Sequence, residues 1–267
     1  MTSYKRIYLF SSKDRDVLAT REKIQNEMEP HGFEFVSNYD DADIIASVGG
    51  DGSFLQACRK TNFNKDKVYI GIKTRLDQNY LYVDFSIDDI PHLVESIDSH
   101  EVSVRKYPVL EVNLNNQMSY MCLNDFYIKS SVIKPMKMEI YIDDEYFEAF
   151  NGDGLLISTP TGSTGYNKSL DGAIIDPKIR SMQLTEIASL NNNNFRTVSS
   201  SVVLGDTRTL KIILDKEGNY YPIMGLDNEA LSIQETDFIS LRIQDKYIRT
   251  LKLPQNSFWS KVQRKFL

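Results

Sequence analysis

The first hundred residues alternate between short apolar runs and amphipathic stretches, and this alternation limits the possible folds more than any other feature of the chain. Strands are expected at 7–10, 33–36, 43–48 and 68–72, and helices at 14–29, 53–60 and 87–97. A helix between two strands returns the chain to the end of the sheet where the first strand began, so the two strands pair in parallel. We therefore expect an α/β domain with a mostly parallel sheet over residues 1–100.

From about residue 101 the pattern changes to one strand-like segment after another. Strands are expected at 107–114, 126–129, 137–142, 146–150, 155–158, 210–214, 238–243 and 247–253, with hairpin turns at 143–144 and 216–219. One helix is expected around 182–189. These features predict a β-rich second domain over residues 101–253. The tail, 254–267, is expected to form a helix from about 257 and to pack back on the first domain.

Charge and composition exclude several classes of function. The chain has 267 residues, with 31 Lys+Arg against 37 Asp+Glu, and the net charge of −6 argues against binding nucleic acid through its phosphates. No apolar run has the length of a membrane span, so we expect no membrane association and a cytoplasmic location. Cys58 and Cys122 lie far from the three histidines, and no zinc-binding spacing is present.

The first motif, Gly-Gly-Asp-Gly-Ser at 49–53, lies where an expected strand meets an expected helix. Glycines allow close backbone approach there, and the free N–H groups of a helix start favour an anion. Asp51 would repel a phosphate unless it binds a metal ion or takes a proton from an attacking hydroxyl, and both are phosphoryl-transfer roles. The simpler interpretation is a tight turn with Asp51 as the N-cap of its own helix. A P-loop enzyme is excluded because the chain has no G-x-x-x-x-G-K-[ST].

The second motif is longer, beginning with Asn-Gly-Asp-Gly at 151–154 and continuing to Tyr166. It offers five Ser and Thr hydroxyls, many free N–H groups and one aromatic ring, which suit phosphates, ribose hydroxyls and a stacked base. A solvent-exposed loop rich in turn residues is the alternative, but such a loop has little reason to carry Tyr166. We favour a ligand-binding loop.

A third motif, Leu-Asn-Asp at 123–125, stands at the start of an expected strand. Asn124 can pair in two directions with an adenine edge, and Asp125 can accept from a ribose diol. Without further context, a turn that starts a strand is the more economical interpretation.

Together the three motifs resemble the NAD kinases, which phosphorylate the 2′-hydroxyl of the adenosine ribose of NAD to give NADP. The resemblance also includes EIASLNNNNFRTV at 186–198 and NSFWSKVQ at 256–263, and it is nearest to the divergent second NAD kinase of Gram-positive bacteria. Diacylglycerol kinases, sphingosine kinases and phosphofructokinases share only the Gly-Gly-Asp-Gly element. The resemblance implies an NAD kinase/diacylglycerol kinase-like fold, and NAD kinase activity.

The resemblance also implies a role for each matching position. Asp51 matches the catalytic base, with Gly52 against the ligand, and Asn124 and Asp125 match the pair that holds the adenosine. Asp153 matches a contact to the second half of the dinucleotide, beside Asn151. The substrate-wrapping loop corresponds to Thr161, Thr164, Gly165, Tyr166, Asn167, Lys168 and Ser169. Ala188 matches a residue that contributes to a neighbouring subunit's site in a homotetramer.

Five departures from the family pattern stand out. Ser53, Asp125, Asn151 and Gly165 replace the usual Thr, Glu, Arg and Ala, and segment 73–80 lacks the usual Thr-Gly-His-Leu-Gly. These departures leave open a non-catalytic NAD(P)-binding sensor as an alternative, although Asp51 and the whole second loop speak against it. A lipid kinase is a third and weaker interpretation.

The resemblance implies ATP or inorganic polyphosphate as the phosphate donor, with Mg²⁺ as the metal ion. The metal ligands are not identified by the sequence, beyond the part that Asp51 would take.

Overall fold

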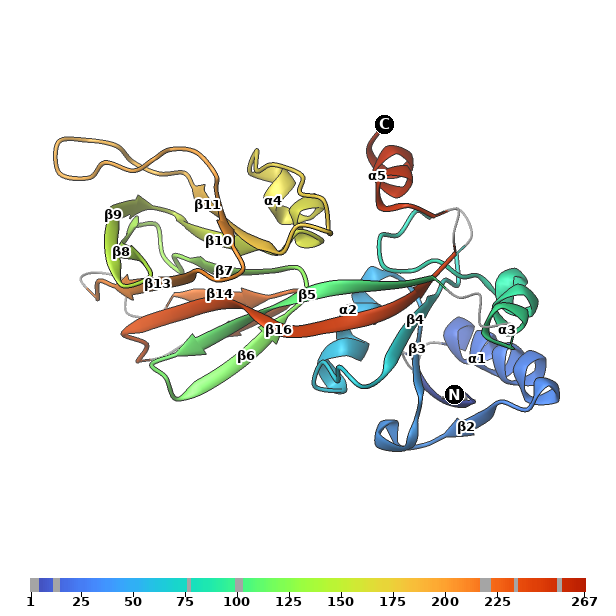
Figure 1. Ribbon diagram of the computed structural model, residues 1–267. Helices are drawn as coiled ribbons and strands as arrows, with labels where there is room; N and C mark the ends of the chain where they lie inside the picture. The colour runs from blue at the N-terminus through green and yellow to red at the C-terminus, as the bar shows by residue number, and fades with distance from the viewer. Residues whose placement is uncertain are drawn as a thin grey trace. The chain divides into compact units, whose positions relative to one another are not determined.

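The computed structural model describes residues 5–11, 15–75, 78–98, 103–216, 222–232, 235–253 and 256–267. The chain packs into two compact units, one of residues 1–107 with 247–267 and the other of residues 108–246 (Figure 1). Two long strands, β5 (Ser103–Leu114) and β16 (Phe238–Lys252), carry the chain out of the first unit and back into it. Unit 2 is therefore an insertion in the sequence of unit 1.

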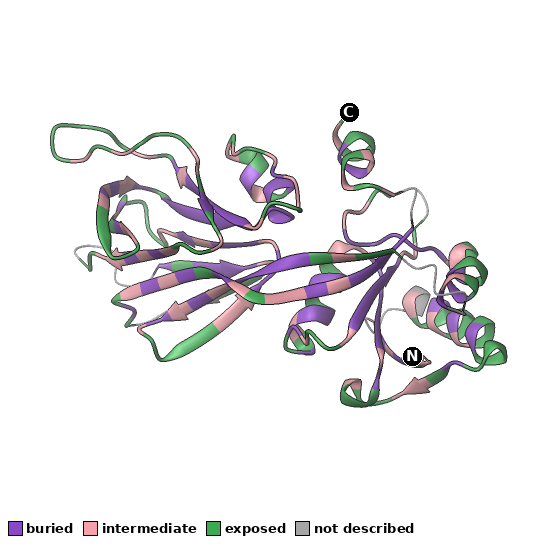
Figure 2. Ribbon diagram, viewed as in Figure 1, coloured by how far each residue is buried: buried purple, intermediate pink, exposed green. Residues whose placement is uncertain are grey.

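The sheet of unit 1 is parallel. It contains β1 (Arg6–Ser11), β2 (Glu34–Val36), β3 (Ile44–Val48) and β4 (Val68–Ile72) in the order β2-β1-β3-β4, and the end of β16 pairs in parallel with β4. Every residue of β3 and β4 is buried (Figure 2). Continuous burial is typical of parallel strands covered on both faces.

Helices cover both faces of this sheet. Figure 1 shows α1 (Arg15–Met28) and α3 (Ile90–Asp98) on one side of the strands and α2 (Asp51–Lys60) on the other. In α1, Thr20, Ile24 and Met28 recur every fourth residue and are buried. Short 3₁₀ turns at Glu29–His31, Tyr39–Asp41 and Ile87–Asp89 join the elements, and α5 (Phe258–Phe266) closes the chain.

The strand order places one loop where ligands bind in folds of this class. The chain moves outward from β1 to β2 and in the opposite direction from β3 to β4, so the order reverses between β1 and β3. Open α/β sheets bind ligands at the carboxyl ends of the strands beside such a reversal. The Gly-Gly-Asp-Gly motif follows β3 at this point.

Unit 2 consists of two antiparallel sheets. One runs in the order β12 (Val202–Gly205), β11 (Ser181–Ile187), β10 (Gly154–Ser158), β7 (Asp125–Lys129), β14 (Ile223–Leu226) and β15 (Glu229–Ser232). The other contains β16, β13 (Thr209–Leu214), β8 (Met136–Ile142) and β9 (Glu145–Gly152), with β5 beside β16 and β6 (Met118–Cys122) beside β5.

Apolar side chains from both sheets of unit 2 form one core. Phe126, Ile128 and Leu155 come from one sheet, and Ile140 and Ile212 come from the other. The short helices at Gly162–Thr164 (η4) and Tyr166–Ser169 (α4) follow β10.

The predicted fold class, an α/β domain followed by a β-rich one, is confirmed. The hairpin turn at 143–144 is also confirmed, since Asp143 and Asp144 have positive φ between β8 and β9. Residues 217–219 of the second expected turn lie outside the described residues. The helices of the described residues are all too short or too polar to cross a lipid bilayer.

Two element predictions are wrong. The helix expected at 182–189 is strand β11. Its Gln183 and Thr185 are buried and bond to a neighbouring loop: Gln183 bonds the backbone of Ala173, and Thr185 donates to Asn167. The strands expected at 238–243 and 247–253 are the single strand β16. Strands β6, β12, β14 and β15 were not predicted.

Candidate active site

The loop after β3 packs so tightly that it needs glycine at two positions. Gly49 has φ +136°, and a Cβ there would lie 2.4 Å from Ser53 Oγ. At Gly50 a Cβ would lie 2.7 Å from the ring of Tyr80. Residues without a Cβ therefore let the loop turn sharply from β3 into α2, and they bring Asp51 to the first turn of that helix.

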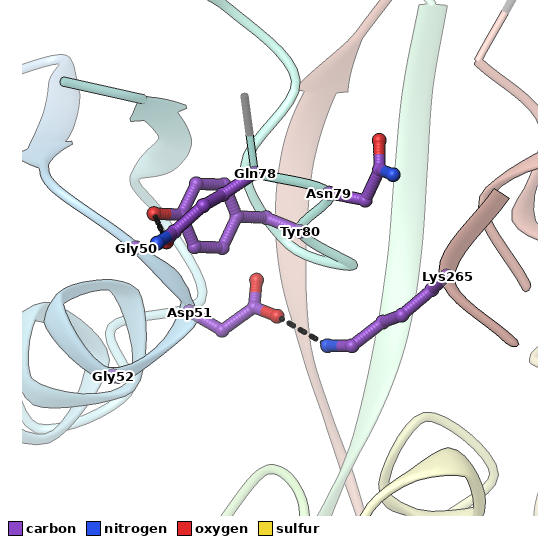
Figure 3. Close-up of a pocket in the computed structure, with 7 residues that line it drawn as sticks. All are labelled: Gly50, Asp51, Gly52, Gln78, Asn79, Tyr80 and Lys265. Carbon is purple, nitrogen blue, oxygen red and sulfur yellow. Dashed lines mark hydrogen bonds and ion pairs between the residues drawn. The ribbon is translucent and has the colours of Figure 1, made fainter. Parts of the chain in front are cut away.

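The Asp51 carboxylate is held by a neighbouring segment. Both of its oxygens accept from the Leu81 N–H at 3.0 Å, and Oδ1 also accepts from the Tyr82 N–H at 2.8 Å. Lys265 Nζ lies 3.4 Å from Oδ2 (Figure 3). The interpretation of Asp51 as its own helix's N-cap is wrong, because the N-cap is Gly50.

A pocket of about 650 Å³ opens at this carboxylate. It is lined by Gly50, Asp51, Gly52, Gln78, Asn79, Tyr80 and Lys265. Figure 3 shows the Asp51 and Lys265 side chains directed toward one another across it. The lining combines one carboxylate and one ammonium with neutral polar groups, so it can receive a polar, charged ligand.

A buried group of charges lies behind the segment that holds Asp51. The side chains of Asp84, Lys252 and Lys261 are 1%, 0% and 4% exposed, and both ammonium groups contact the Asp84 carboxylate. Burial lowers the pKa of Lys261 to about 7 and also lowers the pKa of Lys252.

Lys261 ties this group to the Asp51 site. Its Nζ donates to the carbonyls of Leu81 at 2.9 Å and Val83 at 3.4 Å. The N–H groups of Leu81 and Tyr82 that hold Asp51 therefore belong to a segment fixed from the C-terminal helix. These contacts lie wholly within unit 1.

In unit 2, the turn at 123–125 is clamped from two sides. Thr159 and Thr161 donate their hydroxyls to the Leu123 carbonyl, and Asp227 accepts from the N–H groups of Leu123 and Asn124, the latter at 2.6 Å. A Cβ at Gly162 would lie 1.9 Å from the Asn124 carbonyl oxygen, so the loop after β10 rests on this turn. Asn124 and Asp125 thus have fixed backbones.

Asp125 is the most perturbed acid of the predicted site. Its residue is 5% exposed, and burial, followed by repulsion from Asp227, raises its pKa to about 8. The carboxyl therefore carries a proton at neutral pH, and it can donate one hydrogen bond as well as accept others.

The outward face of β7 leads away from Asp125. Asp125, Tyr127 and Lys129 alternate with the core residues of the strand and share that face. Tyr166 meets Tyr127 edge to face at 5.8 Å between ring centroids, and Lys129 donates to the Tyr166 hydroxyl. An acid, two aromatic rings and an ammonium group thus follow one another along the strand.

The remaining predicted residues divide into two groups. Asn151, Asp153 and Ala188 lie together at the start of β10, where Asp153 N–H donates to Ile187 and Leu190 N–H donates to Asn151. Ala188 is exposed and has φ +48°, and Asp153 is also exposed.

The second group belongs to the loop after β10. Asn167 is fully buried and bonds to Ser163, Ala173 and Thr185, so it braces this loop. Thr164 donates to the Thr161 carbonyl, whereas Lys168 and Ser169 are exposed on α4. Gly165 lies beside Asp125, since a Cβ there would be 3.8 Å from Asp125 Oδ2.

Sequence reasoning missed several residues of these sites. Gln78, Asn79 and Tyr80 fell in segment 73–80, which was considered only as a departure from a family pattern. Lys265 and Asp227 stand outside every motif, and no spacing relates them to Asp51 or Asn124. The single available signal was that NSFWSKVQ runs into the helix that carries Lys265.

Comparisons with known proteins identify the family to which the chain belongs. Residues 123–253 match the family model described as the ATP-NAD kinase C-terminal domain. NAD kinase 2 of Bacillus licheniformis and NAD kinase 2 of Bacillus subtilis (strain 168) are each 47% identical to the chain, over the full length of both proteins. The chain belongs to the NAD kinase family.

Solved structures of NAD kinase type share the fold. A yeast NADH kinase complexed with NADH superposes with a TM-score of 0.82 at 16% identity, over 99% of this chain and 88% of that one. An NAD kinase from Archaeoglobus fulgidus in complex with ATP gives a TM-score of 0.76 at 20% identity, over 97% and 98% of the two chains. The family's fold thus extends over both units of the chain.

Proposed function

We propose that this protein transfers the terminal phosphoryl group of ATP or inorganic polyphosphate to the 2′-hydroxyl of the adenosine ribose of NAD, giving NADP. The observation that carries the proposal is Asp51, a carboxylate directed into a polar pocket after the Gly-Gly turn, in a chain 47% identical to proteins named NAD kinase 2. A carboxylate in this position can accept the hydroxyl proton.

Unit 2 would hold the dinucleotide. In this proposal Asn124 and Asp125 bind the adenosine, and the Tyr166 ring stacks on its base. The fixed backbone at 123–125 supports a binding role, since a preorganised site spends less free energy on ordering. Thr161, Thr164, Gly165, Asn167, Lys168 and Ser169 would form or brace the surrounding loop. Asp153, beside Asn151, would contact the second half of the dinucleotide.

Phosphoryl transfer depends mainly on positioning and on neutralising charge. Among the described residues, no three His, Cys, Asp or Glu side chains group closely enough to hold a metal ion by themselves. Mg²⁺ is commonly bound by one or two carboxylates together with substrate phosphates, and Asp51 fits the protein's share of such a site. The ion would neutralise phosphate charge there.

Replacement of Asp51 tests this proposal. D51N should lower turnover at least ~100-fold, because the side chain can no longer accept a proton. NADP formation is followed with ATP and Mg²⁺ in a coupled assay, and D66N, at an exposed aspartate of the same unit, is the control. Near-normal turnover by D51N would show that Asp51 is not the base.

The sensor alternative is not favoured. The family assignment and the retained Asp51 pocket both support an enzyme. A sensor would bind NAD in calorimetry yet form no NADP with ATP or polyphosphate. The turn at 123–125, where the resemblance places the adenosine, gives the lipid-kinase interpretation no support.

We also propose that the protein forms a homotetramer in the cytoplasm. Its support is the exposed Ala188, held at positive φ immediately after β11, where the family resemblance implies a contribution to a neighbouring subunit's site. Light scattering coupled to size-exclusion chromatography tests the assembly: a mass of four chains is expected, and a monomer at working concentration would contradict it.

A further inference from the structure

Two lysines one helical turn apart on α5 serve different parts of unit 1. Lys261 is buried and donates to the carbonyls of Leu81 and Val83. Lys265 follows four residues later on the same helix face, reaches into the pocket, and keeps 34% of its side chain exposed. The first lysine anchors the helix, and the anchored helix holds the second at Asp51.

The pairing of Lys265 with Asp51 is not required to satisfy the carboxylate. Asp51 already accepts from the N–H groups of Leu81 and Tyr82. The contact therefore needs an explanation other than stability alone.

Charge in the pocket points to that explanation. Among the residues that line it in the described part of the chain, Lys265 is the one cation and Asp51 the one acid, with Gln78, Asn79 and Tyr80 as neutral polar neighbours. A polyphosphate chain carries several negative charges, so it attracts an ammonium group more strongly than a single carboxylate does.

We infer that Lys265 is a catalytic residue that binds the terminal phosphate of the donor, and that it pairs with Asp51 only while the donor is absent. This inference rests on the proposed function and names a residue of the same site. Donor binding draws Lys265 from the carboxylate to the phosphate, and Asp51 is then free to act as a base.

The step balances as follows. The ribose oxygen forms a bond to the terminal phosphorus while its proton passes to Asp51. The bond between that phosphorus and the bridging oxygen breaks, and the shortened donor, ADP or polyphosphate one unit shorter, leaves with the electron pair. Lys265 offsets negative charge on the transferred group throughout.

Binding of inorganic tripolyphosphate to the full-length protein, without NAD or divalent metal, tests the inference by calorimetry. K265Q should weaken binding about 10- to 100-fold, the range for loss of a charge-assisted hydrogen bond. K265R should retain most of it. K60Q, at an exposed lysine of α2, should bind as the wild type does.

If Lys265 exchanges Asp51 for the donor phosphate, removal of the Asp51 charge should have the opposite effect to removal of Lys265. D51N should bind tripolyphosphate more tightly than the wild type, because the variant lacks the competing carboxylate. The double variant D51N/K265Q should lose that gain, and the resulting cycle measures the coupling between the two side chains.

Steady-state kinetics separate this role from a structural one. K265Q should raise the KM for ATP while the KM for NAD and the melting temperature stay near wild-type values. Any of three results would overturn the inference: an equal rise in the KM for ATP and for NAD in K265Q, unchanged tripolyphosphate binding in K265Q, or no gain in tripolyphosphate affinity in D51N. A wild-type protein that makes NADP but binds no tripolyphosphate would overturn the inference and leave the proposed function standing.

Discussion

At the scale of single residues, Asp125 shows how burial changes what an acid can do. Its carboxyl group lies near Asp227 with little access to water, and its pKa of about 8 keeps it protonated at neutral pH. A protonated acid can donate to a ribose oxygen as well as accept from a ribose hydroxyl. The raised pKa therefore sets the hydrogen-bonding character of this position.

The raised pKa predicts how stability depends on pH. Between about pH 4 and pH 8 the folded state retains the Asp125 proton that the unfolded state has released, so this residue's contribution to stability declines as pH rises. Each pKa unit corresponds to about 1.4 kcal/mol. From pH 5 to pH 8, the wild type should lose up to about 4 kcal/mol relative to D125N.

Urea unfolding of both proteins at pH 5, 6.5 and 8 measures this difference. Asparagine keeps the shape of the side chain but does not titrate, so the other titrating groups affect both proteins alike. A difference in unfolding free energy that does not change with pH would contradict the raised pKa.

Tyr166 predicts an effect on substrate binding. Stacking of a base on an aromatic ring is worth about 1–3 kcal/mol by alanine substitution, so Y166A should raise the KM for NAD about 10-fold or more. Y166F keeps the ring and should remain within about 2-fold. Initial rates at saturating ATP measure both, with Y146A, at an exposed tyrosine of β9, as the control. An unchanged KM for NAD in Y166A would exclude the stacking role.

At the scale of elements, β16, α5 and the segment at 81–84 meet at Asp84. D84N would leave the ammonium groups of Lys252 and Lys261 without their shared carboxylate. Removing one partner of a buried ion pair typically costs about 3–5 kcal/mol, so we expect a loss of this size in the free energy of unfolding.

Chemical denaturation measures that loss against D66N, whose exposed side chain should change stability by less than about 0.5 kcal/mol. D84N should also lower turnover, because the segment at 81–84 presents the N–H groups that hold Asp51. Equal stability of D84N and D66N would show that the buried charges do not hold these elements together.

Elements with an unbroken signal could be predicted from the sequence. β3 and β4 are buried throughout and mostly apolar because both of their faces are covered, and the helices between the strands keep their periodicity. β11 could not be predicted as a strand, because its Gln183 and Thr185 are buried through hydrogen bonds to the loop that precedes it, which no periodicity in the sequence signals. In β16 the polar residues 244–246 resemble a turn, although the strand continues through them from one unit to the other.

The candidate site was predictable to the extent that its residues form motifs. Asp51, Asn124 and Tyr166 stand in short runs of glycines, hydroxyls and acids whose chemistry is recognisable. Lys265 meets Asp51 from 214 positions along the chain, and Asp227 meets Asn124 from 103 positions away. Only the fold brings such residues together, and no local pattern signals them.

At the scale of the whole molecule, the insertion of unit 2 within unit 1 predicts which parts fold independently. Residues 1–107 lack β16 and α5, so they leave one side of β4 and the charge of Asp84 uncovered. Residues 106 and 247 lie close together, since Lys106 Nζ is 5.0 Å from the Tyr247 ring centroid. A short Gly-Ser linker can therefore replace unit 2.

We expect a chain of 1–107, linker and 247–267 to fold, and 1–107 alone to remain largely unfolded. Circular dichroism and urea titration distinguish the two, with cooperative unfolding expected only for the linked chain. Cooperative unfolding of 1–107 alone would show that the C-terminal segment is dispensable to unit 1.

The insertion of unit 2 within unit 1 also determines the order in which the two units can fold during synthesis on the ribosome. Strands β1 to β4 emerge first, yet their last neighbour, β16, is translated only after the whole of unit 2, a delay of roughly ten to thirty seconds at about 5–20 residues per second. During that interval the N-terminal strands lack the partners that complete unit 1, so chaperones or other nascent chains can reach their apolar residues. The part of the protein that is made first is thus the part that matures last.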